Sequence, residues 1–274
     1  MLFTHLTTYM PESPFFCKKF VRYFFGLRSS WQRKAIDHFE QSRVPRKSTE
    51  STDKMPNHEL TDIVIILDRS GSMGSVRDAT IEALNGYIQS QKTGDGQVCL
   101  TLIQFDDCYE VFAHAVPITR FPMLSRKTFE PRGSTALFDA IGRTILETGE
   151  RYSQMRETVR PGNVLIVIQT DGFENASKQY TSEKINEMIA IQRDQYAWQF
   201  VFLGANQDAI ASGAKLGIDS GASLTYGANH SGSVAAWDVL AQHTGKFRNA
   251  RKNSNTPVKW EFDETDRRLS DGKK

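Results

Sequence analysis

The sequence predicts an α/β fold: a doubly wound sandwich with a mostly parallel central sheet, one antiparallel edge strand and helices on both faces. Three observations support this prediction. The continuous apolar run from Ile63 to Leu67 has the composition of a central strand buried on both faces. The order of apolar strand, polar loop and amphipathic helix then recurs along the chain, as right-handed βαβ crossovers require. One segment, 110–117, follows its preceding strand too closely for a crossover helix.

The remaining elements follow in order from that first strand. Ile81, Leu84 and Ile88 form one apolar stripe, which predicts a helix over 76–91. The strand over 110–117 pairs antiparallel with its predecessor and therefore belongs at a sheet edge. The other expected elements are strand 98–105, helix 137–155, strand 163–169, helix 182–195, strand 198–203, a short helix at 209–216, a weak strand at 223–226 and a helix at 233–243.

The chain divides into one domain between two basic ends. Its 274 residues, 39% of them hydrophobic, suffice for one large core, and the apolar elements place that domain at 59–245. Residues 1–58 form a basic extension and a polar linker that we expect to be disordered, with Met55 as an alternative start. Residues 246–274 form a basic tail that we expect to be loosely held, with one short candidate strand at 258–262.

Composition and charge exclude several functional classes. A net charge of +2 lacks the basic excess of a dedicated nucleic-acid binder. No run reaches the ~18 apolar residues that a transmembrane helix needs, and no secretory signal is recognisable. Three cysteines are too few for a disulfide framework and fit reduced thiols, so we expect a cytoplasmic protein without membrane insertion. The basic aromatic segment 15–25 could lie on an anionic membrane surface or be an unordered extension.

One carboxylate and two hydroxyls follow the first strand within five residues. Asp68, Ser70 and Ser72 occupy alternate positions of this loop, and alternate positions of an extended loop point the same way. Gly71 can adopt the backbone angles of a tight turn. The D-x-S-x-S pattern is weak by itself, because serine and glycine before a helix also serve as turn and cap residues.

Two later segments bring further oxygen atoms to the same edge of the predicted sheet. A Gly-Ser-Thr turn presents the hydroxyl of Thr135 just before the helix at 137, and a buried strand ends in Thr170-Asp171-Gly172. Ligands of such sheets bind at the carboxyl ends of the strands. The alternatives are structural: the serines could cap the following helix, Thr135 could cap its own helix, and Asp171 could form a plain turn.

These three segments, in this order, resemble the metal-ion-dependent adhesion site (MIDAS) of von Willebrand factor A (VWA) domains. The resemblance spans roughly 59–245 and implies a Rossmann-like VWA sandwich of the stand-alone bacterial or phage type. It implies a complete metal site made of Asp68, Ser70, Ser72, Thr135 and Asp171. Magnesium is the expected cation, with manganese or calcium as alternatives, because magnesium prefers oxygen ligands. In the family the hydroxyls bind the metal directly, the carboxylates act through waters, and an Asp or Glu of a partner protein completes the coordination.

The resemblance implies a metal-dependent protein-binding module without catalytic activity. Many bacterial members serve an AAA-type ATPase as adaptors, which makes such an ATPase a candidate partner. The alternative is a magnesium-dependent phosphoryl-transfer hydrolase of the haloacid-dehalogenase type, which also opens with an apolar strand ending in Asp. Such enzymes resemble D-x-D at this point, whereas Ser70 stands at the second position here. No G-x-S-x-G elbow or Walker A sequence occurs, so we expect no enzyme.

Other polar residues at the predicted strand ends give weaker signals. Asp106 and Asp107 could line the rim of the site or form a solvated hairpin turn. Four further residues are candidates for partner contact or ordinary loop residues, namely Glu174, Asn175, Asn206 and Gln207.

Overall fold

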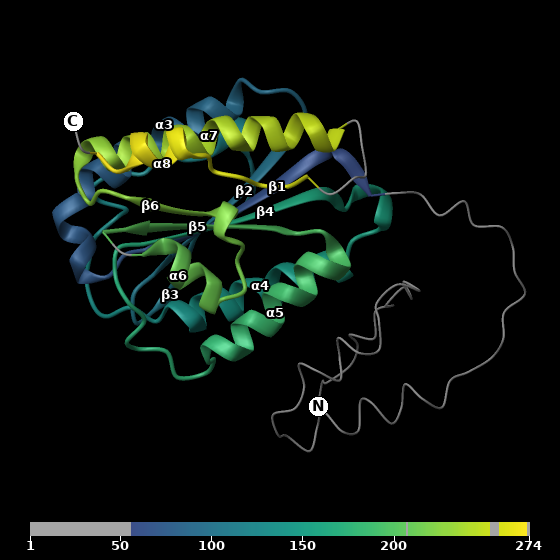
Figure 1. Ribbon diagram of the computed structural model, residues 1–274. Coiled ribbons are helices and arrows are strands. Elements are labelled where there is room, and N and C mark those ends of the chain that lie inside the picture. Colours follow the sequence, from purple (N-terminus) through teal and green to yellow (C-terminus); the bar gives the residue numbers. More distant parts are fainter. Residues whose placement is uncertain (1–55, 207, 253–257, 273–274) are drawn as a thin grey trace, which may run out of the picture.

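The computed structural model describes residues 56–206, 208–252 and 258–272 (Figure 1). Within these ranges six strands form one sheet in the order β3-β2-β1-β4-β5-β6. All neighbouring pairs are parallel except β2 and β3, so β3 is the antiparallel edge strand that the sequence predicts. The strands are β1 (Asn57–Asp68), β2 (Gln97–Phe105), β3 (Tyr109–Pro117), β4 (Pro161–Thr170), β5 (Gln199–Ala205) and β6 (Ser223–Tyr226).

Strands β1 and β4 lie side by side in the middle of the sheet. The run from Ile63 to Leu67 is fully buried, as is the facing run from Leu165 to Ile168. Leu67 pairs in register with Gln169, so both strands end at the same edge. The last residues of the two strands, Asp68 and Thr170, therefore meet at the centre of the carboxyl edge. This register positions the candidate site.

Helices cover both faces of the sheet, which confirms the predicted sandwich (Figure 1). Helices α3 and α7 pack against each other on one face, and α4 and α5 lie on the other. The helices are α3 (Arg77–Lys92), α4 (Leu137–Ser153), α5 (Ser182–Tyr196), α6 (Ala209–Lys215), α7 (His230–Lys252) and α8 (Glu264–Ser270). Four short 3-10 helices complete the described elements: η1 (Gly71–Val76), η2 (Ile118–Arg120), η3 (Glu157–Val159) and η4 (Ser220–Ala222). No helix in the described ranges is both long and apolar enough to span a membrane.

The expectation that the chain beyond Thr244 is loosely held is wrong for the part of it that the structure describes. Helix α7 was predicted to end at 243, but it continues to Lys252 with Phe247 buried. Its basic residues turn inward: Arg248 Nη1 donates to the Gln91 carbonyl over 3.2 Å. Arginine can bury its aliphatic stem while its guanidinium bonds to carbonyl oxygens, so the basic composition of this segment is misleading.

The segment after α7 also packs on the domain. No strand forms at 258–262; instead Trp260 and Phe262 are buried against His243 and Phe247 of α7. Helix α8 follows, and its N-terminus is closed by a capping box formed by Asp263 and Asp266. The extension before Pro56, including Met55, lies outside the described residues.

Candidate metal centre

The loop after β1 folds back on the carboxylate of Asp68. Asp68 Oδ1 accepts a 2.7 Å hydrogen bond from the Ser70 backbone N–H, and Asp68 Oδ2 accepts a 2.5 Å bond from the Thr170 hydroxyl. The hydroxyls of Ser70 and Ser72 lie 3.1 Å apart. The carboxylate and both serine hydroxyls therefore gather at one place, as their alternate spacing predicts.

Asp171 joins this group from the loop after β4. Its Oδ1 accepts a 2.6 Å hydrogen bond from the Ser72 hydroxyl. Asp171 is only partly buried, whereas Asp68 is fully buried at the end of β1. The two carboxylates of the candidate site thus lie at different depths, with the Ser72 hydroxyl bound to the outer one.

The hydroxyl of Thr135 completes the group from the loop before α4. The position of Gly172 shows how close these oxygen atoms lie. A Cβ placed on Gly172 would lie 3.3 Å from Thr135 Oγ1, 3.6 Å from Ser72 Oγ and 4.0 Å from Asp68 Oδ2. Three oxygen atoms from two loops therefore surround one point on the third loop. All five residues singled out by the sequence are brought together at the carboxyl edge of the sheet.

Backbone hydrogen bonds fix the three loops relative to one another. Gly71 N–H donates to the Gly133 carbonyl (3.2 Å), and Arg132 N–H donates to the Arg69 carbonyl (2.8 Å). The Thr135 carbonyl accepts from Asn175 N–H (3.0 Å), and the Asn175 side chain accepts from Thr135 N–H (2.9 Å). The oxygen atoms are consequently held in place by the folded backbone itself.

The glycine that requires a special conformation is Gly133 and not Gly71. Gly133 has a φ of 66°, in the left-handed region, while Gly71 is not among the residues with positive φ. A Cβ on Gly133 would lie 2.2 Å from the Asp107 carboxylate. The tight turn expected in the first loop therefore belongs to the second loop, two residues before Thr135.

The structural alternatives for the hydroxyl residues are not supported. Ala136, not Thr135, occupies the N-cap of α4, and neither serine of the first loop makes a side-chain cap bond. The Phe138 N–H at the start of α4 is instead bonded to Glu174 Oε2 at 2.9 Å. The Thr135 hydroxyl is left to face the other oxygens of the site.

Negative charge accumulates at the site without a cationic side chain to balance it. Burial raises the pKa of Asp68 to about 6, and the nearby Asp171 carboxylate adds to this rise. Burial also raises the pKa of Asp171, although the hydrogen bond from Ser72 partly lowers it. No Lys or Arg forms an ion pair with either carboxylate within the described ranges. Two carboxylates with three hydroxyls are a donor set that suits a hard divalent cation.

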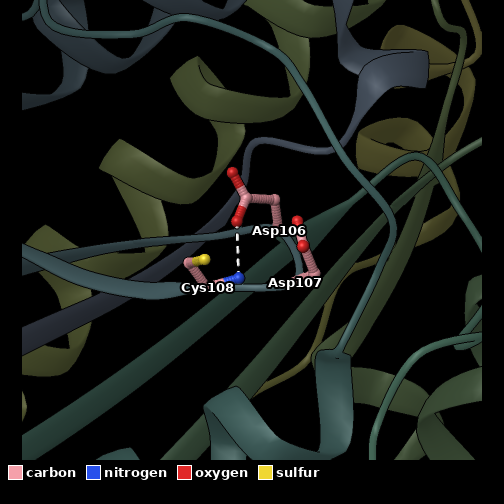
Figure 2. A group of neighbouring side chains, drawn as sticks. All are labelled: Asp106, Asp107 and Cys108. Carbon is pink, nitrogen blue, oxygen red and sulfur yellow. Dashed lines mark hydrogen bonds between the residues drawn. The ribbon is translucent and has the colours of Figure 1, made fainter.

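Asp106, beside the site, is among the residues that the sequence singles out, but the sequence does not predict its burial. The interpretation of Asp106 as a solvated turn residue is wrong, because its side chain is 0% exposed, whereas its neighbour Asp107 is exposed. Figure 2 shows Asp106 Oδ1 accepting a 2.6 Å hydrogen bond from the backbone N–H of Cys108. Asp106, Asp107 and Cys108 present close ligand atoms, but Asp106 is already bound to two arginines.

Those two arginines belong to the loops of the candidate site. Asp106 Oδ2 lies 3.1 Å from Arg69 Nη2 and 3.0 Å from Arg132 Nε, and Glu110 pairs with both guanidinium groups. Arg69 lies between Asp68 and Ser70 in sequence, so the ion pairs of Asp106 and Glu110 with the two arginines anchor the first and second loops of the site. The sequence does contain a signal for this cluster: each of the first two loops carries an arginine, and a buried arginine needs a carboxylate partner.

The weaker candidates for partner contact have internal roles. Glu174 bonds to the start of α4 and to the N–H groups of Ala176 and Ser177. Asn175 supports Thr135, and Asn206 Oδ1 accepts from Ala228 N–H over 2.8 Å. Gln207 lies outside the described residues.

Solved structures share this fold at low sequence identity. Proximal thread matrix protein 1 (PTMP1) from the mussel byssus matches with a TM-score of 0.50 and 13% identity, over 69% of this chain and 46% of that chain. The pilus adhesin SpaC from Lactobacillus rhamnosus GG, in its open conformation, matches with a TM-score of 0.52 and 13% identity, over 71% and 31%. This chain has the fold of von Willebrand factor A domains.

A von Willebrand factor type A protein from Catenulispora acidiphila also matches, with a TM-score of 0.46 and 12% identity over 70% of this chain and 43% of that chain. PTMP1 has in addition been solved with zinc in its MIDAS motif. This chain spans less than half the length of each of these proteins. No family model matches the sequence, and no curated protein matches it. What PTMP1 and SpaC share with this chain is therefore the fold.

Proposed function

We propose that this VWA chain is a metal-dependent protein-binding module whose MIDAS holds one divalent cation. The observation that carries the proposal is the convergence of Asp68, Ser70, Ser72, Thr135 and Asp171 from three loops onto one point at the carboxyl edge of the sheet. Ligands of open α/β sheets bind at this edge.

The donor set indicates which cation the site prefers. Its ligands are carboxylate and hydroxyl oxygens without histidine or cysteine, which favours magnesium or the similar manganese and calcium over softer metals. A bound cation would balance the paired charges of Asp68 and Asp171, whose pKa values are raised mainly by burial. We therefore assign magnesium as the resident ion.

The partner that fits this site presents an Asp or a Glu. If the three neutral hydroxyls bind the cation directly and the two carboxylates act through waters, as the family resemblance implies, the cation keeps affinity for a further anionic oxygen, and an acidic side chain supplies one. An AAA-type ATPase is the partner class we propose, because many bacterial proteins of this family serve such ATPases as adaptors. A phosphoryl-transfer hydrolase is disfavoured, since Ser70 provides no second carboxylate to act as general acid.

The test uses two libraries of displayed peptides that differ only at the central position, which is Asp in one library and Asn in the other. The full chain is immobilised in magnesium buffer, and we expect it to retain Asp peptides and to release them in chelator. The Asp68→Ala variant should retain none, while the matched variant Asp107→Asn, altered at an exposed carboxylate outside the site, should behave as wild type. Equal recovery of Asn and Asp peptides, or recovery unaffected by chelator, would overturn the proposal.

A further inference from the structure

Phe173 is a large apolar side chain exposed to water next to the candidate metal site. Its exposed fraction is 73%, the highest among the exposed large apolar residues in the described ranges. Single exposed apolar residues are common on protein surfaces and need no explanation by themselves. The position and support of Phe173 distinguish it from the others.

The backbone on both sides of Phe173 is held firmly. Before it, the Gly172 N–H donates to the Thr170 hydroxyl over 3.1 Å. After it, the N–H groups of Asn175 and Ala176 both donate to the Thr135 carbonyl, at 3.0 and 3.2 Å. These bonds fix the backbone position of Phe173, whose Cα lies within about 7 Å of the Cα of Asp171.

The polar neighbours of Phe173 in this loop are all used inside the domain. Asp171 accepts from Ser72, Glu174 binds the start of α4, and Asn175 supports Thr135. Phe173 is the large apolar side chain of this loop that is exposed to solvent, next to the exposed Asn175. An exposed aromatic side chain on an anchored backbone, beside a polar anchor point, is an arrangement that protein interfaces use at their centres.

We propose that Phe173 determines which acidic segments bind, by packing against a large apolar side chain within two positions of the partner's Asp or Glu. Alternate side chains of an extended peptide point the same way and lie about 7 Å apart. An acidic residue directed at the site thus places a nearby side chain over the ring. This inference rests on the proposed function, since the acidic residue sets the register.

The test uses the Asp-centred library with random flanking residues and the full chain in magnesium. Wild type should enrich peptides with a large apolar residue at one fixed position near the Asp. Phe173→Ala should lose this preference and bind a selected peptide about tenfold more weakly, while Phe173→Leu should keep the preference. Val159→Ala is the matched control, because Val159 is 48% exposed in η3, just before β4 at the opposite edge of the sheet.

The outcomes separate this inference from the function on which it rests. Asp peptides recovered in magnesium without an apolar preference, or with the same preference in Phe173→Ala, would overturn the role of Phe173 and leave the metal-dependent module standing. No magnesium-dependent recovery of Asp peptides would overturn both.

Discussion

The Ser72 hydroxyl donates a 2.6 Å hydrogen bond to Asp171 Oδ1 although 99 positions separate the two residues in sequence. This bond joins the loop after β1 to the loop after β4. The Ser70 hydroxyl lies 3.1 Å from Ser72 and extends the chain of oxygens toward the buried end of the site. Ser72 is therefore the side chain that links the inner and outer halves of the candidate metal centre.

Replacing Ser72 with alanine should weaken magnesium binding about tenfold. The substitution removes both a candidate ligand and a hydrogen bond to a carboxylate, and such bonds contribute about 1.5–3 kcal/mol. Calorimetric titration with magnesium measures the effect. Ser134→Ala is the control, because Ser134 is an exposed serine of the loop before α4. Equal affinities in the two variants would remove Ser72 from the site.

Replacing Asp106 with asparagine should destabilise the domain by about 3 kcal/mol, the lower end for a broken buried ion pair. Arg69 is buried and would lose one of its two carboxylate partners, keeping Glu110. Because Arg69 lies between Asp68 and Ser70, magnesium affinity should fall as well. Urea unfolding and metal titration measure the two effects.

The neighbouring carboxylate supplies the control for that experiment. Asp107 is exposed, so Asp107→Asn should change the free energy of unfolding by no more than about 0.5 kcal/mol. If Asp106→Asn and Asp107→Asn were equally stable and bound magnesium equally well, the ion-pair cluster would have no role in positioning the loops.

The sequence predicts the centre of this molecule better than its periphery. Continuous apolar, β-branched runs such as Ile63 to Leu67 are typical of central strands, and residues at the carboxyl ends of parallel strands meet at one edge. Two adjacent aspartates, by contrast, do not reveal which one points inward. That choice depends on Arg69 and Arg132, which reach Asp106 from other loops.

The C-terminal segment was misjudged for a related reason. Basic residues at the end of α7 are typical of a solvated helix, yet Arg248 and Arg251 are buried with their guanidinium groups bonded to backbone and side-chain oxygens. The acceptors come from distant segments, including Gln91 and Asn163. These hydrogen bonds form only in the tertiary structure, so the local sequence pattern does not predict them.

Replacing Trp260 with alanine should destabilise the domain by about 3–5 kcal/mol, the usual loss for a large buried aromatic side chain. Trp260 packs on His243, Phe247 and Phe262, so it fastens the C-terminal segment to α7. Denaturant unfolding measures the loss. Leu269→Ala in the same segment is the control, because Leu269 is 58% exposed. A Trp260→Ala variant as stable as Leu269→Ala would mean that the segment does not pack as described.

Magnesium affinity should fall as the pH drops below about 6. Burial raises the pKa of Asp68 from its ordinary 3.8 to about 6 in the metal-free protein, so a proton competes with the cation below that pH. Each further pH unit should lower the affinity by up to about tenfold.

The stability of the metal-free protein should show the opposite trend. The charged form of Asp68 is disfavoured in the fold, so its destabilising effect is fully present above about pH 6 and decreases as the pH falls from about 6 towards the ordinary pKa of 3.8. Magnesium titrations and urea unfolding of the metal-free protein, each at about pH 7.5 and 5, measure the two trends. An affinity independent of pH over this range would contradict the assignment of Asp68 as a carboxylate that serves the cation.

The central claim is that this VWA fold holds a divalent cation through Asp68. Calorimetry of the full chain with magnesium and manganese, comparing wild type with Asp68→Ala and with the control Asp107→Asn, tests it most directly. We predict one cation bound per chain in wild type and in the control. Asp68→Ala should bind none while keeping the wild-type circular dichroism spectrum. Binding of either cation to folded Asp68→Ala with wild-type affinity would contradict the account.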